Sequence, residues 1–241
     1  MKTKTALLLL SLPIFLSSCI ISGWDNAISG NGNVREESRN VDGFDGVHVS
    51  SGIDVLLSQG ADFEVVVETD ENLHEIIETY VEGSLLVVKT DHVSIRNAKA
   101  KRVHVTLPEL RELKISSAGD CVGQTPFSCK DLRLEISSAG DLTLDVDAED
   151  IHLDISSSGD CDLSGRCDEF RASLSSAGDL DAFELEARKV DVSASSAGDA
   201  KVWASEEISM NASSAGNIYY RGDAQVVNSR TSSAGNIVKR D

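Results

Sequence analysis

The sequence of 241 residues has few aromatic side chains, few basic side chains and, beyond its N-terminal segment, no long hydrophobic run. Trp, Tyr and Phe make up 5% of the chain, and 22 Lys and Arg stand against 40 Asp and Glu. The net charge of −18 argues against binding nucleic acid or an anionic membrane face through charge, because like charges repel. No later apolar run is long enough to cross a membrane.

The histidines also lack any metal-ligand spacing. The stretch HEIIE at 74–78 begins like a zinc-protease motif but has no second His, so it is interpreted as a surface helix turn. His104, within RVHVTL, is expected at an outward strand position. The stretch GNGNVR at 30–35 lacks the third Gly of a dinucleotide-binding loop, and no strand precedes it. We therefore expect no metal and no cofactor at these positions.

The N-terminus predicts export. A basic start, MKTK, precedes the apolar run ALLLLSLPIFL and then LSSC, which ends at Cys19. This pattern resembles a bacterial lipobox and predicts a signal peptide over 1–18 and a lipid on Cys19; an ordinary secretory signal is the alternative. The residue after the lipidated Cys is Ile20 rather than Asp, which would favour retention in the inner membrane. Ile20 therefore indicates the outer membrane as the location of the lipid anchor.

The mature chain would consist of a tether and two β-rich parts. Cleavage before Cys19 removes Lys2 and Lys4 and leaves 223 residues with a net charge of −20. The polar, Gly- and Asn-rich residues 19–40 predict a tether between the lipid and the folded body. We expect an N-terminal β-rich capping region over 41–110 and repeats over 111–241.

A six-residue motif occurs seven times. Versions of ISSAGD place a Gly at 119, 140, 159, 178, 198, 216 and 235, with spacings of 21, 19, 19, 20, 18 and 19 residues. A fixed period of this length predicts a solenoid. Apolar residues stand at every second position before each Gly, which is the period of a strand. The sequence therefore predicts an all-β, right-handed parallel β-helix of about seven coils.

Both ends of this rod are expected to be closed. The apolar interior thins toward Ser229 and Thr231, so the final coil, ending in VKRD, is interpreted as a polar cap against edge pairing. In the N-terminal part, SSGID at 50–54 is a degenerate copy of the motif. We also expect a short helix over about 72–79 and a hairpin around Glu82-Gly83-Ser84.

The chain resembles a known bacterial family. The segment VDGFDGVHVSSGIDVLLSQG, followed by serial SSAGD or SSAGN turns and GNIVKR, is similar to the auto-transporter adhesins with a head GIN domain, over roughly 41–238. The resemblance implies a β-helical fold and a place in the cell envelope, and it brings no catalytic residues. This chain departs from the family in having Ala in the third place of the turn and four additional cysteines.

A column of carboxylates is the first candidate site. In stacked coils these residues would lie about 4.8 Å apart and repel one another. One interpretation is a turn role, because Gly followed by Asp or Asn tolerates positive φ and bonds nearby backbone groups. The other is a line of Ca²⁺ ions on oxygen ligands. The column consists of Asp120, Asp141, Asp160, Asp179 and Asp199, continued by Asn217 and Asn236.

Serines and cysteines form further columns. The Ser two before each Gly could suggest a nucleophile, but with no matching His column a hydroxyl ladder is expected instead. The four cysteines of the repeat region occupy the same two places in two coils. We predict disulfides Cys121–Cys129 and Cys161–Cys167, which an exported compartment permits; four buried reduced thiols are the alternative.

The remaining candidate is a small aromatic patch. Trp203, Tyr219 and Tyr220 fall in neighbouring coils and could contact a sugar or a protein, although core packing is the more common role of such residues. We expect a non-enzymatic, lipid-anchored envelope protein, an adhesin or scaffold, whose protein or glycan partner the sequence does not name. The alternative is a polysaccharide-acting β-helical enzyme, but the short, even coils leave no loop to build a cleft.

Overall fold

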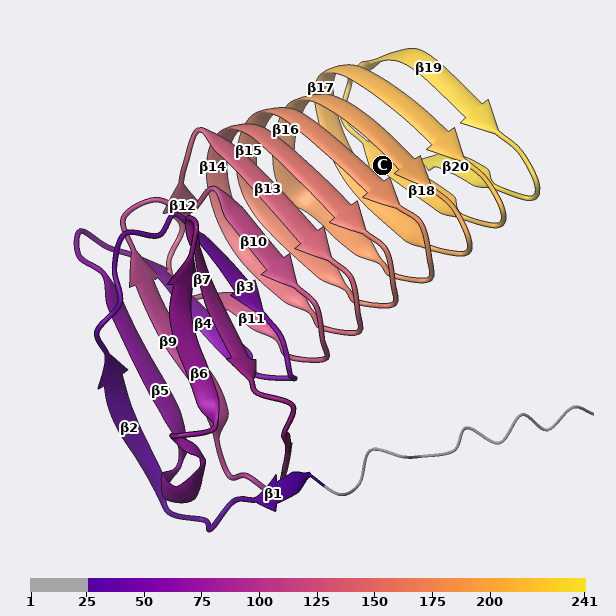
Figure 1. Ribbon diagram of the computed structural model, residues 1–241. Helices are drawn as coiled ribbons and strands as arrows, with labels where there is room; N and C mark the ends of the chain where they lie inside the picture. The colour runs from indigo at the N-terminus through magenta and orange to yellow at the C-terminus, as the bar shows by residue number, and fades with distance from the viewer. Residues whose placement is uncertain (1–25) are drawn as a thin grey trace, which may run out of the picture.

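The computed structural model describes residues 26–241, so the expected signal peptide and Cys19 lie outside the described residues. The described part contains twenty strands and a single 3₁₀ turn. Eighteen of these strands belong to one sheet that winds into a rod of stacked coils (Figure 1). The expected all-β solenoid of about seven coils is confirmed.

Each coil of the rod contributes one strand to each of two faces. Face A contains β10 (Glu112–Ile115), β13 (Asp131–Ile136), the second halves of β14 (Leu142–Ile155), β15 (Cys161–Leu174), β16 (Leu180–Ala194) and β17 (Asp199–Ala212), and then β19 (Gln225–Thr231). Face B contains β11 (Cys121–Gly123), β12 (Phe127–Ser128), the first halves of the same four long strands, β18 (Asn217–Arg221) and β20 (Asn236–Lys239). All these neighbours pair in parallel, and the Ser-Ser-Ala-Gly-Asp corners lead from face A to face B.

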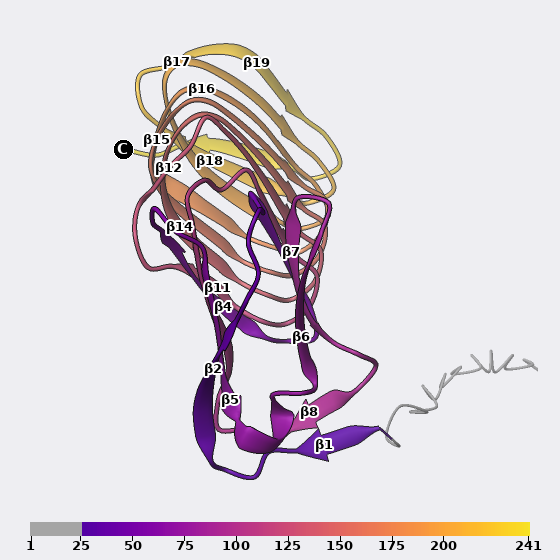
Figure 2. The same ribbon diagram turned by 60° about the vertical axis from the view of Figure 1, so that its left-hand side comes forward.

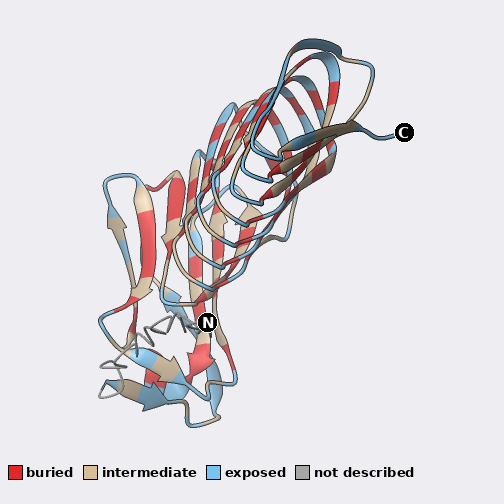
Figure 3. Cartoon of the chain, turned by 90° about the vertical axis from the view of Figure 1, so that its right-hand side faces the viewer, coloured by how far each residue is buried: buried red, intermediate tan, exposed pale blue. Residues whose placement is uncertain are grey.

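Alternation of buried and exposed residues fills the interior. Along β14 nearly every second side chain is buried, and the same pattern recurs in the next three long strands (Figure 3). The residues four before each repeat Gly are buried from Ile115 through Ala212, whereas Thr231 is exposed. The apolar interior therefore ends before the last coil, as its composition predicted.

The N-terminal part continues the rod in an order that differs from the order of the chain. Strands β3 (Gly46–Val49) and β4 (Asp54–Gln59) pair in parallel with β10 and β11 on one side. On their other side they pair in parallel with β7 (Leu85–Thr90) and β9 (Lys101–Leu107). The corner SSGID thus stacks on the first SSAGD corner. One hydrophobic cluster runs from Phe44 to Ile218, so the two parts share a single core.

Antiparallel strands close the N-terminal end of the rod. On face A, β6 (Ile77–Glu82) pairs antiparallel with β7; on face B, β5 (Glu64–Asp70) pairs with β9 and then with β2 (Val34–Arg39) (Figure 2). A separate pair, β1 (Ala27–Ser29) with β8 (Ser94–Arg96), lies beside them. The sequence of β2 is VREESR and it is largely exposed. Charged side chains on such an edge discourage another chain from pairing with it.

The helix expected over 72–79 is wrong. Only Glu71–Leu73 forms a 3₁₀ turn, and β6 begins at Ile77. The apolar spacing of Leu73, Ile76 and Ile77 resembles a helix stripe, but pairing with β7 satisfies the backbone of this segment and covers the edge of face A. The hairpin around Glu82-Gly83-Ser84 is present, with Gly83 at φ +65° and Glu82 opposite Leu85.

The tether expected over 19–40 is also too long. From residue 26 onward this segment belongs to the folded body, because β1 pairs with β8 and β2 pairs with β5. The buried Asp70 fixes it in place: its carboxylate accepts backbone N–H bonds from Gly32 at 2.7 Å and from Lys99 at 3.0 Å. The prediction took the polar composition of this segment as a sign of a linker, but an edge strand can be equally hydrophilic.

Candidate functional site

The aspartate column forms a hydrogen-bonded ladder along one corner of the rod. The backbone N–H of Asp160 donates to Asp141 Oδ1 at 3.0 Å, and the N–H of Asp179 donates to Asp160 Oδ1 at 3.3 Å. The N–H of Asp199 continues the ladder to Asp179 Oδ1 at 3.0 Å. Asp120 donates in the same way to Asp54, a member of the column that the sequence analysis missed within the degenerate corner. Each N–H donated to a carboxylate offsets part of the repulsion between neighbours.

Asparagine extends the upper part of the column by one further coil. The Nδ2 group of Asn217 donates to Asp199 Oδ1 at 2.6 Å. No group of three or more His, Cys, Asp or Glu side chains that could hold a metal ion occurs within residues 26–241. The hydrogen bonds along the column are those that the turn role requires.

The repeat glycines serve close approach, and the positive φ that Gly and Asp tolerate is not adopted at either position of the repeated corner. A Cβ at Gly140 would lie 2.4 Å from the carbonyl oxygen of Gly119, and one at Gly159 would lie 2.3 Å from that of Gly140. None of the seven repeat glycines has a positive φ. In the last three corners it is Ser and Ala that adopt positive φ, at Ser196-Ala197, Ser214-Ala215 and Ser233-Ala234.

The serine column forms the expected hydroxyl ladder in part. Ser138 Oγ donates to Ser116 O at 3.1 Å and Ser176 Oγ to Ser156 O at 2.9 Å, while Ser117 Oγ accepts the backbone N–H of Gly52 at 2.6 Å. These serines lie at the half-exposed surface of the corner rather than inside the rod. The ladder therefore holds neighbouring corners together.

One serine does contact a histidine. His48 Nε2 lies 3.0 Å from Ser116 Oγ, and that hydroxyl also lies 3.3 Å from the carbonyl oxygen of Val49. Burial and the neighbouring Lys114 lower the pKa of His48. No carboxylate is hydrogen-bonded to His48 among the described residues, so the pair lacks the third member that orients a catalytic base.

The predicted disulfides Cys121–Cys129 and Cys161–Cys167 are absent, and all four cysteines are free thiols. Cys161 and Cys167 lie on the same extended strand, six residues and roughly 20 Å apart, beyond the reach of a disulfide. Cys121 pairs with Leu142 of β14, and Cys129 follows Ser128, which pairs with Asp147. These are the positions of β14 that Cys161 and Cys167 flank from the other side, so Cys121 and Cys129 are equally far apart. Burial raises the pKa of Cys129 to about 11 and that of Cys167 to about 12.

The aromatic patch is assembled differently from the expectation. Pairing places Trp203 and Tyr219 on the outer surface of face B, whereas Tyr220, opposite Val202, packs against the interior. Tyr219 carries the Arg240 guanidinium at 4.8 Å from its ring centre. The residue that the sequence analysis missed is Phe183, whose ring lies 4.1 Å from the Arg221 guanidinium.

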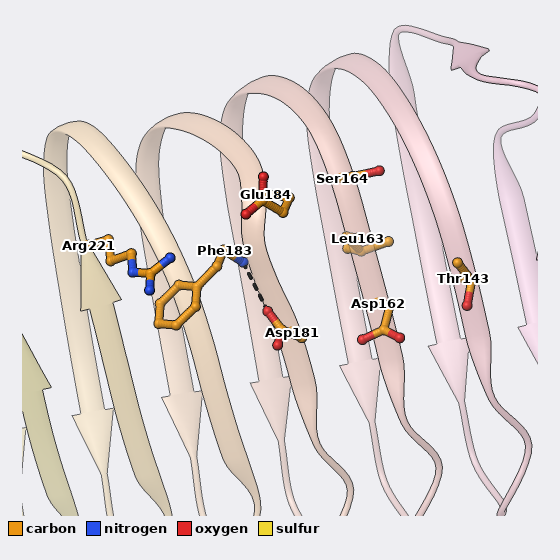
Figure 4. Close-up of a pocket in the computed structure, with 8 residues that line it drawn as sticks. All are labelled: Thr143, Asp162, Leu163, Ser164, Asp181, Phe183, Glu184 and Arg221. Carbon is orange, nitrogen blue, oxygen red and sulfur yellow. Dashed lines mark hydrogen bonds between the residues drawn. The ribbon is translucent and has the colours of Figure 1, made fainter. Parts of the chain in front are cut away.

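An irregularity in β16 creates a pocket around Phe183. Opposite β15 the register shifts between Asp162 and Ser164, and opposite β17 it shifts again between Ala182 and Glu186. The extra residues bulge out of face B and turn Phe183 toward the surface (Figure 4). The signal in the sequence was the twenty-residue spacing between Gly178 and Gly198, longer than the next spacing.

We call this hollow the Phe183–Arg221 pocket. It has a volume of about 300 Å³ and is lined by Thr143, Asp162, Leu163, Ser164, Asp181, Phe183, Glu184 and Arg221. Asp181 is already satisfied, since it accepts Lys201 Nζ at 2.7 Å and the backbone N–H of Phe183 at 3.3 Å. Desolvation, together with the nearby Asp181 and Asp160, raises the pKa of Asp162.

Within the part of the chain that the structure describes, no helix is long and apolar enough to span a membrane.

The fold and its corners define the class: a two-faced β-solenoid whose coils are joined by repeated Ser-Ser-Ala-Gly-Asp turns and whose first end is capped by antiparallel strands. The chain belongs to the family described as putative auto-transporter adhesin, head GIN domain, whose family model matches residues 43–224. The resemblance inferred from the sequence is confirmed.

Solved structures with the same fold are similar to this chain at low identity. A putative adhesin from Bacteroides fragilis is 19% identical, with a TM-score of 0.80 over 88% of this chain and 99% of the other. A putative lipid binding protein from Parabacteroides distasonis is 20% identical, with a TM-score of 0.73 over 90% and 100%. A putative adhesin from Parabacteroides merdae is 18% identical, with a TM-score of 0.71 over 90% and 100%. No curated protein matches the chain.

Proposed function

We propose that this chain is a lipid-anchored adhesin of the bacterial outer membrane, a binding module rather than an enzyme. The observation that carries the proposal is the placement of the ends. The described chain begins at the capped end of the rod, seven residues after Cys19, and finishes at the opposite end (Figure 1). A lipid on Cys19 would hold the capped end at the membrane and project the last coils away from it.

Charge and family support the same proposal. After cleavage before Cys19, a net charge of −20 would keep the rod from adhering to an anionic membrane, so the lipid rather than the protein surface would attach it. The family and three of its structural neighbours are described as putative adhesins, which supports a place in the cell envelope. Several acyl chains on one cysteine would make that attachment stable.

Lipid attachment is tested by labelling cells that express the full chain with radioactive palmitate. The wild type should incorporate the label and fractionate with the outer membrane. The Cys19→Ala variant should lose both, whereas the matched Cys129→Ala variant should keep both. Absence of label from the wild type would contradict the anchor. Equal labelling of the wild type and the Cys19→Ala variant would also contradict it.

One observation favours an enzyme as the second candidate. Asp162 and Glu184 are two carboxylates facing one pocket, and Asp162 has a raised pKa, as a proton donor in glycoside hydrolysis requires. The purified chain should nevertheless release no reducing ends from soluble starch, xylan or polygalacturonate. Release that disappears in the Asp162→Asn variant would establish the polysaccharide-acting enzyme in place of the adhesin.

A further inference from the structure

The Phe183–Arg221 pocket combines an aromatic ring with hydrogen-bonding groups that lack partners. Two of its carboxylates, Asp162 and Glu184, form no hydrogen bond or ion pair with any residue from 26 to 241. Arg221 Nε is buried and has no hydrogen-bond acceptor. A buried donor without a partner costs free energy, so a ligand oxygen that reached it would be bound favourably.

The ring of Phe183 supplies the apolar part of the site. Its only ring contact among the described residues is the guanidinium of Arg221, which lies 4.1 Å from the ring centre. This contact positions the ring beside the cavity and leaves another part of it lining the pocket. The face of an aromatic ring is electronegative and attracts the polarised C–H groups of a sugar ring.

The polar groups around the ring match a polyhydroxylated ligand. Asp162 and Glu184 can accept hydrogen bonds from hydroxyls, while Arg221 can donate to them. The hydroxyls of Thr143 and Ser164 can do either. Donors and acceptors on several sides of one aromatic ring suit a sugar better than an apolar ligand, which would leave these groups without water or partners.

Charge decides which sugars fit. Lys201 neutralises Asp181, and the single charge of Arg221 faces two unpaired carboxylates, so the pocket keeps a slight negative charge. It would therefore repel uronates and phosphates. The volume of about 300 Å³ is at the lower end for ligand pockets and allows one or two sugar rings.

We propose that the Phe183–Arg221 pocket binds an uncharged saccharide, with Phe183 as the stacking platform and Asp162, Glu184 and Arg221 as its hydrogen-bonding partners. This inference rests on the proposed function as a binding module and names the class of its ligand. The pocket lies on the outer surface of face B, where a chain of sugars could enter from the side (Figure 4).

Titration calorimetry of the purified full chain tests the inference with three neutral probes: maltotriose, triacetylchitotriose and lactose. At least one should bind. The Phe183→Ala variant should weaken that binding at least tenfold and the Asp162→Asn variant several-fold. Trp203→Ala, which removes an aromatic side chain from the same face outside the pocket, should leave it unchanged. Equal melting temperatures of the wild type and Phe183→Ala would show that the loss reflects contact rather than unfolding.

Three results would overturn the inference: no binding of any neutral probe, binding of trigalacturonate in preference to them, or equal weakening by Trp203→Ala and Phe183→Ala. If Phe183→Ala lowers the melting temperature, Glu184→Gln replaces it in the test, because Glu184 is exposed. This variant should also weaken saccharide binding. Failure here would leave the lipid anchor intact, since palmitate labelling tests that separately. Failure of the labelling would leave saccharide binding intact.

Discussion

At the scale of single residues, each position of the repeated corner has its own task. The serines bond to the carbonyl oxygens of the neighbouring coil, as Ser138 does to Ser116. Gly allows the backbones of neighbouring coils to approach closely, and Asp accepts the N–H of the next Asp along the rod. Seven nearly equal copies of one arrangement are an architectural device, because a catalytic group would need a distinct environment at one of them.

Gly140→Ala tests the close approach. The added Cβ would lie 2.4 Å from the carbonyl oxygen of Gly119, so backbone must move in a stack that transmits the shift to both neighbours. We expect unfolding in urea to show a loss of about 1–3 kcal/mol. Ala139→Gly, one residue earlier on the exposed corner, should lower the free energy of unfolding by about 1 kcal/mol at most. Similar losses for the two variants would argue against the steric role of the glycine.

Ala215→Gly tests the strained corners near the C-terminus. Ala215 has φ +67°, which costs an Ala residue about 1–2 kcal/mol that Gly avoids, although Gly loses more entropy on folding. The variant should gain up to about 1 kcal/mol in urea unfolding. The same change at Ala139, whose φ is not positive, should give no gain. Destabilisation at both sites would mean that the two kinds of corner do not differ in solution.

Thiol counting tests the correction to the cysteine pairing. Cys121 and Cys161 are buried and their pKa values are raised by desolvation, so the native protein should react slowly with a thiol reagent near pH 8, Cys129 first. After denaturation without reductant, mass spectrometry should find Cys121, Cys129, Cys161 and Cys167 all alkylated. A pair of these cysteines that stays unmodified would show that a disulfide is present.

At the scale of elements, the coils could be predicted from the sequence because every copy obeys the same alternation. Ile136, Leu134 and Leu132 are all buried, as a strand period requires. The bulge in β16 was visible only as a longer spacing, which fixes neither its place nor the direction of Phe183. The stacking of β3 between β7 and β10 could not be predicted, since local periodicity carries no information on which strands become neighbours.

Asp70 makes the attachment of the first strands to the cap depend on pH. Burial opposes its ionisation, but backbone N–H groups of Gly32, Lys99 and Ala100 outweigh burial and lower its pKa below the ordinary value. The stabilisation is therefore present at neutral pH and is lost as pH falls below about 4 through the lowered pKa. Asp70→Asn should lower the urea midpoint at pH 6 and flatten its decline toward pH 3. A parallel decline in both proteins would contradict this role.

At the scale of the whole molecule, one continuous core makes the cap and the coils a single rod. Cluster residues run from Phe44 near the cap to Ile218 near the last coil, and the first end is closed by β2, β5 and β6. On face A the eight steps from β7 to β19, at about 4.8 Å each, span roughly 38 Å. Such a rod, held at its capped end by a lipid, would project its last coils away from the membrane, which is the central claim of the proposed function.

Energy transfer to the membrane tests that claim most directly. The lipid-modified chain, carrying Cys129→Ala, would be placed in vesicles that contain an acceptor dye in the bilayer. A donor dye would label either Glu36→Cys in β2 or Gln225→Cys in β19, both at exposed positions. We predict strong transfer from residue 36 and weak transfer from residue 225. Equal transfer from the two labels, or stronger transfer from residue 225, would contradict a rod held at its capped end.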